Sequence, residues 1–284
     1  GHTGLICLLG SPCAHSISPM MHNRAFEEAG LDYRYLAFDV NEQNLETAVN
    51  GLKALHVRGF NLTMPDKNRM LTLCDRLSDA ASLIGAVNTV VNDNGILIGH
   101  NTDGIGYMRS VKDAGFDIIG KKMTLLGAGG AATAILVQAA LDGVKEISVF
   151  VRRTSRFYDR AVATAAALRE KTGCWIQLWD FEDTDRLKNE LADSTILTNA
   201  TSIGMAPNED ICPIPDSSFL RDGLIVSDII YNPKETLLLK LAREKGLPCF
   251  NGSYMLLYQG AEAFKLWTGQ QMPISLIKAE FFAS

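Results

Sequence analysis

The stretch Met123-Thr-Leu-Leu-Gly127-Ala128-Gly129-Gly130-Ala131-Ala132 decides the fold. An apolar run ends in glycines, and Ala/Ile/Leu-rich sequence at helical spacing follows through Leu141, which predicts a strand, a tight turn and a helix. Gly127 can take a turn that a Cβ would resist, and Gly129 lets backbone N–H groups approach a pyrophosphate. Ala132 allows the helix to pack closely on its strand. The stretch therefore predicts a dinucleotide site at a helix N-terminus.

A second buried strand follows the helix, and it ends in a basic turn. The strand runs from Lys145 to Val151, and Arg152, Arg153 and Arg156 come directly after it. In a dinucleotide fold this strand end meets the adenosine ribose, where an acidic residue holds the 2′-OH of NAD and arginines hold the 2′-phosphate of NADP. No Asp or Glu stands there, so NADP is predicted. A solvated basic turn that binds nothing is the alternative.

Length and composition bound the class of protein. With 284 residues, 47% of them apolar, the chain is expected to form two domains. The net charge of −5 and the lack of long Lys/Arg runs argue against nucleic acid or a membrane surface as partner. Six dispersed cysteines without C-x-x-C predict reduced thiols in a cytoplasmic protein and no metal site. No stretch resembles a signal peptide or a membrane span.

The front of the chain places two serines between a strand and a helix. Leu5 to Leu9 reads as a buried strand, and an amphipathic helix is predicted from about Met20 to Ala29. Ser18 before a proline is typical of an N-cap. That interpretation leaves Ser16, on the loop, to hydrogen-bond a ligand.

Further polar residues follow predicted strands. Asn61 and Thr63 share one face of a short strand, and Lys67 stands at the start of the next helix, where a cation is unfavourable. This makes Lys67 a candidate functional residue, with a plain surface lysine as the alternative. After a hairpin with an Asn-Gly turn, another strand ends in a polar cluster that holds Asp103. The cluster fits a functional site and a helix N-cap equally well.

Strands and helices alternate through the second half of the chain. Such alternation predicts an α/β fold with a doubly wound, parallel, Rossmann-type sheet. The C-terminal segment is amphipathic, and Gln259 is the polar exception on its apolar face.

Seven ordered blocks resemble the shikimate dehydrogenase family. They are Ser16-Ile-Ser18, Asn61-Leu-Thr63-Met-Pro-Asp-Lys67, Gly85-Ala-Val-Asn88-Thr89, Asn101-Thr-Asp103-Gly104, the Gly127 to Ala132 loop, Asn199-Ala-Thr201-Ser-Ile-Gly204-Met205, and Gly252 to Gln259. The resemblance implies reversible reduction of 3-dehydroshikimate to shikimate by NADPH, a step of aromatic amino-acid biosynthesis. It also implies a substrate domain over 3–104, a Rossmann domain over 105–250, and C-terminal helices over 251–284 that pack on the substrate domain.

The same resemblance implies roles for single residues. Lys67 and Asp103 would be the catalytic pair, and Ser16 and Ser18 would bind the substrate carboxylate. The other implied substrate contacts are Asn61, Thr63, Asn88, Asp103, Gln259 and Tyr231. The implied cofactor contacts are Gly127, Ala128, Gly129, Gly130, Ala131, Arg152, Arg153, Arg156, Thr201, Met205, Ile229, Gly252 and Met255.

One departure keeps alternatives open. The family's usual Asn-Arg-Thr appears here as Val151-Arg152-Arg153, and this double arginine resembles the quinate/shikimate dehydrogenase branch, which can accept NAD. A broader quinate/shikimate enzyme is therefore the second interpretation. A dinucleotide-binding sensor without turnover is the third, although such a protein would not need Lys67, Asp103 and Gln259 together. The sequence implies no partner protein and no particular oligomeric state.

Overall fold

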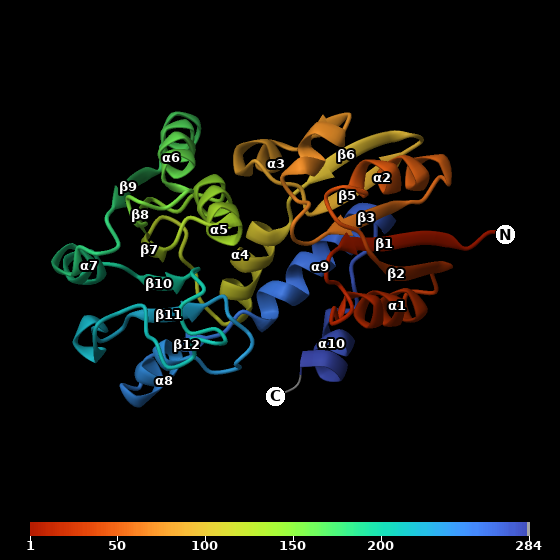
Figure 1. Ribbon diagram of the computed structural model, residues 1–284. Coiled ribbons are helices and arrows are strands. Elements are labelled where there is room, and N and C mark those ends of the chain that lie inside the picture. The colour runs from red at the N-terminus through yellow and green to blue at the C-terminus, as the bar shows by residue number, and fades with distance from the viewer. Residues whose placement is uncertain (283–284) are drawn as a thin grey trace. The chain divides into compact units, whose positions relative to one another are not determined.

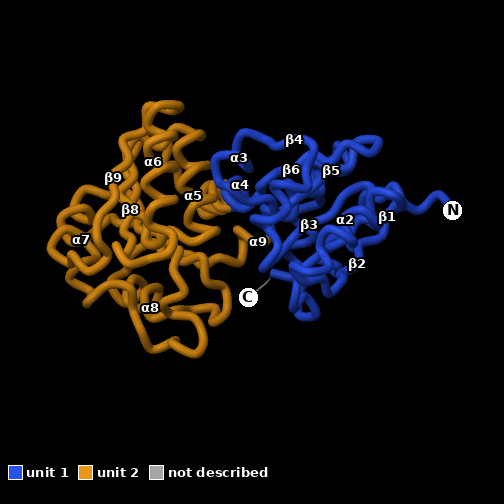
Figure 2. The backbone as a smooth tube through the Cα atoms, turned by 45° about the horizontal axis from the view of Figure 1, so that its top comes forward, with its two compact units in different colours: residues 1–106, 257–284 blue, residues 107–256 orange. Residues whose placement is uncertain are grey.

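The computed structural model describes residues 1–282, and the chain forms two compact units (Figure 2). Unit 1 contains residues 1–106 and the C-terminal segment that starts at Leu257, and unit 2 contains residues 107–256. Both boundaries fall inside helices, α4 (Asp103–Asp113) and α9 (Ser253–Thr268). Each unit is built around its own six-stranded sheet.

Unit 1 is a mixed α/β unit. Its further elements are β1 (Gly4–Gly10), α1 (Ser18–Glu28), β2 (Tyr33–Asp39), α2 (Leu45–Ala54), β3 (Gly59–Leu62), the 3-10 helix η1 (Arg69–Leu73), β4 (Arg76–Leu77), α3 (Asp79–Ile84), β5 (Thr89–Asp93), β6 (Ile96–His100), α10 (Ile274–Ile277) and the π-helical turn η3 (Lys278–Phe282).

The sheet of unit 1 has the order β2-β1-β3-β5-β6-β4. Strand β1 is parallel to β2 and β3, whereas β5 is antiparallel to β3 and β6. Both residues of the Asn94-Gly95 turn have positive φ, which confirms the predicted hairpin. Because β5 runs opposite to its neighbours, its start lies at the same sheet edge as the ends of β1, β3 and β6.

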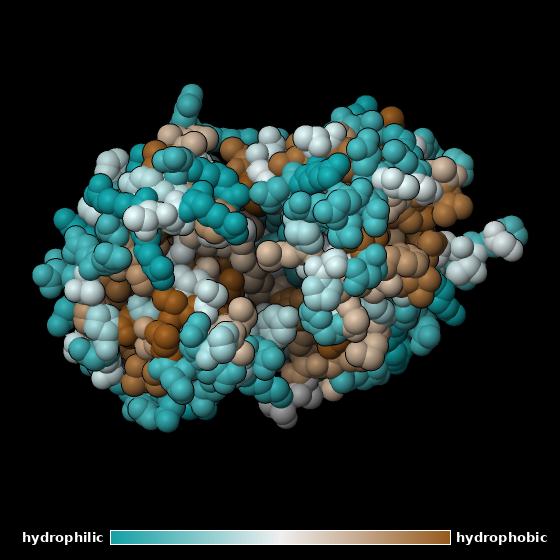
Figure 3. Space-filling model, viewed as in Figure 1, coloured by the Kyte–Doolittle hydropathy of each residue, from teal (hydrophilic) through white to brown (hydrophobic). Residues whose placement is uncertain are grey.

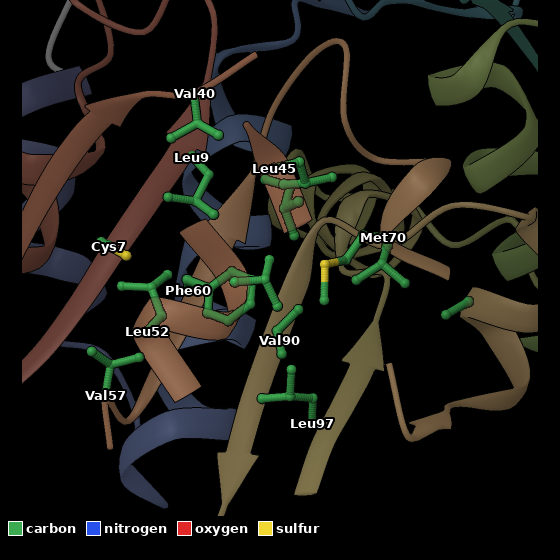
Figure 4. Packing of buried hydrophobic residues seen from close by; sticks show 14 residues of the cluster. Cys7, Leu9, Val40, Leu45, Leu52, Val57, Phe60, Met70, Val90 and Leu97 are labelled. Carbon is green, nitrogen blue, oxygen red and sulfur yellow. The ribbon is translucent and has the colours of Figure 1, made fainter. Parts of the chain in front are cut away.

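Helices cover both faces of this sheet (Figure 1). On one face α2 packs against Cys7, Leu9 and Phe60, and Phe60 lies inside the resulting apolar cluster (Figure 4). On the other face α1 and α9 bring together an aromatic cluster of His22, Phe26, Tyr35, Phe264 and Trp267. The Trp267 indole N–H donates to the Val90 carbonyl at 2.9 Å, which ties the C-terminal helix to the sheet.

Unit 2 is the predicted strand and helix alternation. Its further elements are β7 (Lys122–Leu126), α5 (Gly130–Leu141), β8 (Glu146–Phe150), α6 (Tyr158–Thr172), β9 (Trp175–Trp179), α7 (Thr184–Leu191), β10 (Ile196–Asn199), the 3-10 helix η2 (Ser217–Phe219), β11 (Ile225–Asp228), α8 (Leu237–Glu244) and β12 (Cys249–Phe250).

All neighbouring strands of this second sheet are parallel, in the order β12-β11-β10-β7-β8-β9. This is the Rossmann order, in which the winding direction reverses between β7 and β10. The side chains of α7 and α8 pack together against one face, and α5 contacts α6. The predicted doubly wound parallel sheet is confirmed.

Both units expose some large apolar side chains, among them Leu55, Met64 and Trp175. The face seen in Figure 3 carries many hydrophilic residues, with groups of hydrophobic residues between them. Among residues 1–282, none of the helices combines the length and the apolar character that crossing a bilayer requires.

Candidate active site

Polar side chains from distant segments meet at one edge of the unit 1 sheet. Lys67 follows β3, Asn88 precedes β5, and Asp103 follows β6. The topology brings these three segments to the same edge, so residues that are separated in the sequence become neighbours.

The closest contact at this edge is an ion pair between Lys67 and Asp103. The Lys67 Nζ lies 2.7 Å from the Asp103 Oδ2, and the two side chains are 28% and 14% exposed. The backbone of Lys67 is fixed as well, because its carbonyl accepts a hydrogen bond from the Val87 N–H at 2.8 Å. The structure thus brings the candidate amine and the candidate carboxylate into direct contact and keeps both partly shielded from water.

Asn88 holds the second oxygen of Asp103. Its Nδ2 donates to the Asp103 Oδ1 at 2.8 Å and to the Thr102 Oγ1 at 3.0 Å. Its Oδ1 accepts from the Thr102 N–H at 2.8 Å and from the Thr89 hydroxyl at 3.0 Å. Because a backbone N–H can only donate, the orientation of the Asn88 amide is fixed.

The segment before α4 combines a contact that stabilises the helix start with the candidate carboxylate Asp103. The Asn101 Oδ1 accepts from the Asp103 N–H at 3.1 Å, and the Asn101 Nδ2 donates to the Ala86 carbonyl. Asn101 thus stabilises the helix start, and the Asp103 side chain is directed to Lys67 and Asn88. The capping interpretation of this cluster therefore applies to Asn101, and Asp103 is the candidate functional residue.

Asn61 stands on β3, an inner strand of the sheet, and is only 6% exposed. Its Nδ2 donates to the Asn88 carbonyl at 3.0 Å and to the Thr89 hydroxyl at 2.9 Å. Its Oδ1 accepts from the Tyr35 hydroxyl at 2.7 Å. Both amide hydrogens of Asn61 are therefore used inside the protein.

The two serines stand at the start of α1. The expected N-cap role of Ser18 is wrong: the N-cap is Ile17, without a side-chain capping bond, and Ser18 is the first residue of the helix. The Ser16 Oγ accepts from the Ser18 N–H at 3.2 Å instead. Pro19 explains the shift, because it fits the first turn without needing an N–H partner.

Two further candidates belong to unit 1. Thr63 is half-buried directly after β3, and its N–H donates to the Leu9 carbonyl at 2.9 Å. Gln259 is half-buried on α9.

The glycine turn of unit 2 has the geometry that a dinucleotide needs. Gly127 has φ of +107°, and a Cβ there would lie 2.8 Å from the Ala200 carbonyl oxygen, so only glycine fits. Gly129 is the N-cap of α5, and a Cβ on Gly129 or Gly130 would meet no atom within 4 Å. The backbone of the first turn of α5, which includes Ala131, is therefore open to an anion.

A cavity of about 240 Å³ lies beside this turn, at the carboxyl edge of the sheet. Its walls come from the segments after β7, β8, β9 and β10, and they include Gly127, Ala128, Arg152, Phe181 and Thr201. The position agrees with the Rossmann rule, which places the ligand where the strand order reverses.

The three candidate arginines have different surroundings. Arg152 lines the cavity. The Arg153 Nε lies 3.4 Å from the Asp180 Oδ2, and the Arg156 guanidinium lies over the Phe157 ring at 4.7 Å. Two residues near these arginines were not indicated by the sequence. One is Asp180, directly after β9. The other is Arg160, whose buried Nε finds no hydrogen-bond partner within residues 1–282.

The loop after β10 is fastened by a buried polar cluster. The Asn199 Oδ1 accepts from the Thr201 hydroxyl at 2.7 Å, and the Asn199 Nδ2 donates to the Asp228 Oδ2 at 3.1 Å. Burial raises the pKa of Asp228, although hydrogen bonds from Ile230, Asn199 and Thr236 oppose the shift. This cluster fixes Thr201 at the cavity wall.

The remaining candidates of unit 2 follow β10, β11 and β12. Met205 and Tyr231 are exposed, and Ile229 and Met255 are half-buried. A Cβ on Gly252 would overlap the Ile229 carbonyl, so glycine is required where these two segments touch. Within residues 1–282, no group of three or more His, Cys, Asp or Glu could hold a metal ion.

A Rossmann unit with an open glycine turn, joined to an α/β unit with a half-buried Lys–Asp pair, defines a pyridine-nucleotide-dependent oxidoreductase. Two family models match the chain: the shikimate dehydrogenase substrate binding domain over residues 8–90, and the shikimate 5'-dehydrogenase C-terminal domain over residues 252–280. A shikimate dehydrogenase that is 54% identical over 99% of this chain extends the match to the whole length, so the chain belongs to the shikimate dehydrogenase family.

Individual relatives cover nearly the whole chain. A shikimate dehydrogenase (NADP(+)) from Listeria monocytogenes serotype 4b is 54% identical over 282 residues, which are 99% of this chain and 97% of that protein. The crystal structure of shikimate 5-dehydrogenase from Listeria monocytogenes, in complex with shikimate and NAD, superimposes with a TM-score of 0.95 at 54% identity and covers 98% of this chain and 96% of that chain. Quinate dehydrogenase from Corynebacterium glutamicum, in complex with NAD, has a TM-score of 0.87 at 30% identity and covers 99% of both chains.

Proposed function

We propose that this protein is an NADP-dependent shikimate dehydrogenase, which interconverts shikimate and 3-dehydroshikimate in aromatic amino-acid biosynthesis. The observation that carries the proposal is the 2.7 Å contact between the Lys67 Nζ and the Asp103 Oδ2 at the polar edge of the unit 1 sheet. Similarity to an NADP(+)-dependent enzyme and to a shikimate complex, each at 54% identity, supports the substrate and the cofactor.

Unit 1 would bind the substrate, with the C-terminal helices as part of that domain, and unit 2 would bind the cofactor. Hydroxyl and amide side chains suit a polyhydroxylated ring with one carboxylate, because each ring hydroxyl needs a hydrogen-bond partner once it is buried. The proposed substrate contacts in unit 1 are Ser16, Ser18, Asn61, Thr63, Lys67, Asn88, Asp103 and Gln259. Tyr231, which belongs to unit 2, is a further proposed contact.

The residues of unit 2 fit a dinucleotide. The N-terminus of α5 and the open backbone at Gly129 and Gly130 would hold the pyrophosphate, and the arginines after β8 would hold a 2′-phosphate. The proposed contacts are Gly127, Ala128, Gly129, Gly130, Ala131, Arg152, Arg153, Arg156, Thr201, Met205, Ile229, Gly252 and Met255. The bound nicotinamide supplies the hydride chemistry.

The chain itself handles the proton. When shikimate is oxidised, the hydroxyl on the reacting carbon loses its proton, and the Lys67–Asp103 pair would accept it. In the reverse direction the pair returns a proton to the developing alkoxide. Asn88 keeps the Asp103 carboxylate in place, so the Lys67–Asp103 pair would not have to reorganise during the reaction.

A spectrophotometric assay tests this proposal. Purified protein is mixed with shikimate and NADP, and the formation of NADPH is followed by its absorbance. We expect turnover that depends on both compounds. A protein that binds NADP but oxidises neither shikimate nor quinate would contradict the proposal and favour the sensor interpretation.

Quinate oxidation with NAD is the second candidate function. The Asp180 carboxylate beside Arg153 favours it, because a negative charge near the ribose edge suits NAD better than NADP. The same assay with quinate and with NAD decides between the two: comparable rates on both acids would assign the protein to the broader quinate/shikimate type.

We also propose that the protein is located in the cytoplasm. Its support is the set of six cysteines, all of which are unpaired, as is typical of a reducing compartment.

A further inference from the structure

We propose that Tyr35 is a positioning residue for the Lys67–Asp103 pair, acting through Asn61 and Asn88. This inference rests on the proposed function. Tyr35 stands on β2, at the outer edge of the sheet, and the sequence indicates no role for it beyond the core. Its hydroxyl donates at 2.7 Å to the Oδ1 of Asn61, which belongs to β3, the second strand along the sheet from β2.

Tyr35 is held at three places. The Asn23 side chain bonds both its N–H and its carbonyl, at 2.8 and 2.9 Å. The His22 ring stacks on the Tyr35 ring, with centroids 4.6 Å apart and an interplanar angle of 11°. The side chain is fully buried, so its hydroxyl has one well-defined position.

The direction of the hydrogen bond from Tyr35 follows from its neighbours. The Asn88 carbonyl can only accept, so the Asn61 group that faces it is the NH2. The Asn61 oxygen therefore faces Tyr35, and the tyrosine hydroxyl must donate. Burial raises the pKa of Tyr35 well above its ordinary value, so the hydroxyl keeps its proton, and a hydrogen bond from Ser18 opposes this shift only in part.

The bonds continue in the same direction toward the ion pair. Asn61 donates to the Thr89 hydroxyl, Thr89 donates to the Asn88 Oδ1, and Asn88 donates to the Asp103 Oδ1. Lys67 then donates to the other Asp103 oxygen. Aligned hydrogen bonds of this kind polarise and strengthen one another, so loss of the first donor weakens the bonds that hold the carboxylate.

Loss of the Tyr35 hydroxyl would leave the Asn61 oxygen buried without its donor. The Asn61 amide would then rotate or shift, and the change would pass to Asn88 and Asp103. Misplacement of a proton-transfer group lowers kcat without weakening the binding of NADP to the other unit.

The test is the Tyr35→Phe variant, which keeps the ring on His22 and removes only the hydroxyl. We expect kcat for shikimate oxidation to fall about 3- to 10-fold, the factor that corresponds to one net hydrogen bond. The KM for NADP should stay close to that of the wild type. The thermal unfolding midpoint should fall by a few degrees, because the Asn61 oxygen is left buried without a donor. Tyr33→Phe is the matched control, because it removes a hydroxyl from the same strand away from Asn61, and its kcat should be unchanged.

A second pair of measurements identifies the route. If Tyr35 acts through Asn61, Tyr35→Phe should lower kcat no further in an Asn61→Ala background. An unchanged kcat in Tyr35→Phe would overturn the inference. So would a kcat that Tyr35→Phe lowers by the same factor in the Asn61→Ala background as in the wild type. A crystal structure of Tyr35→Phe tests it independently of turnover, because an unaltered Asn61–Asn88–Asp103 arrangement would also overturn it. A wild-type protein without shikimate turnover would instead contradict the proposed function.

Discussion

Lys67 and Asp103 are 36 residues apart in the sequence and 2.7 Å apart in the structure. Asp103 receives hydrogen bonds on both oxygens, one from an amine and one from an amide. The amine can move a proton, and the amide cannot, so the two donors have different roles: Lys67 is the candidate for chemistry, and Asn88 for orientation.

Replacement of Lys67 by alanine should slow turnover severely and leave cofactor binding intact. General acid–base groups contribute roughly 10²- to 10⁴-fold to a rate, so kcat for shikimate oxidation should fall by about that factor. Fluorescence titration should give an NADP dissociation constant close to that of the wild type. Lys53→Ala is the control, since Lys53 pairs with Asp75 on the surface. Loss of NADP affinity in Lys67→Ala would contradict the assigned role.

At the scale of single elements, the ends of β8 and β9 decide the charge beside the cavity of unit 2, the proposed cofactor site. Arg152 lines the cavity, whereas Arg153 pairs with Asp180, on a strand end that the sequence did not connect with the site. The Asp180 carboxylate partly neutralises Arg153 and would repel a 2′-phosphate.

Asp180→Asn should therefore shift the preference toward NADP. Because the ion pair is largely exposed, the ratio of kcat/KM for NADP to that for NAD should rise only about two- to fivefold. Steady-state kinetics with both cofactors at saturating shikimate measure this ratio. Asp185→Asn, on the exposed first turn of α7, is the control. An unchanged ratio would show that Asp180 does not affect the cofactor.

A second element-scale feature stabilises the opposite edge of the same sheet. The Lys122 Nζ lies within 3.1 Å of carboxylates of Glu146, Glu190 and Asp193, at the starts of β7 and β8 and the end of α7. Burial would lower the pKa of Lys122, but hydrogen bonds to Asp193, Glu190 and Glu146 outweigh it and raise this pKa. Burial would likewise raise the pKa of Glu190, but hydrogen bonds from Lys122 and Ser148 lower it.

Lys122→Met should lower the free energy of unfolding by about 2–3 kcal/mol, less than for a fully buried pair because the Asp193 partner is exposed. Because the pKa of Glu190 is lower in the folded protein than in the unfolded chain, its contribution to stability is complete above the unfolded-state pKa. That contribution is lost as the pH falls through the folded-state pKa. Urea unfolding at neutral pH and at pH 3 should therefore give a smaller difference between variant and wild type in acid. Lys145→Met, at an exposed position, should leave stability unchanged. An equal loss with Lys145→Met would contradict the assigned role of the cluster.

The elements differ in how far the sequence predicts them. The doubly wound parallel sheet was predictable, because an apolar run, a glycine turn and a helical repeat follow one another, and Gly127 has the positive φ that the pattern implies. The strands β4 and β12 have two residues each, too few for a periodic signal. The Tyr35–Asn61 and Arg153–Asp180 contacts depend on which strands become neighbours, and a single sequence does not record strand order.

At the scale of the whole molecule, a buried histidine connects stability with pH. His22 is fully buried among aromatic rings, and burial lowers its pKa to about 3. In the unfolded chain a histidine titrates near 6.5, so between about 6.5 and 3 the unfolded state binds one more proton. The contribution of neutral His22 is complete above pH 6.5 and is lost progressively as pH falls below it.

His22→Phe should remove this dependence. Between pH 6.5 and 4, the free energy of unfolding of the wild type should fall more steeply than that of the variant, by about 1.4 kcal/mol per pH unit. Urea unfolding followed by circular dichroism at several pH values measures both slopes. His56→Phe serves as the control, since His56 is exposed. Equal slopes for wild type and His22→Phe would mean that His22 already carries a proton in the folded protein.

The discontinuity of unit 1 has a consequence for exchanging parts between relatives. In topological terms unit 2 is an insertion, because the chain leaves unit 1 within α4 and returns to it within α9. A single transplanted gene block, 107–256, can therefore carry a new cofactor preference if its crossovers preserve the helical phase of both helices. Transfer of the substrate contacts of unit 1 instead requires two blocks from the same parent, because Trp267 of the tail bonds Val90 of the front segment.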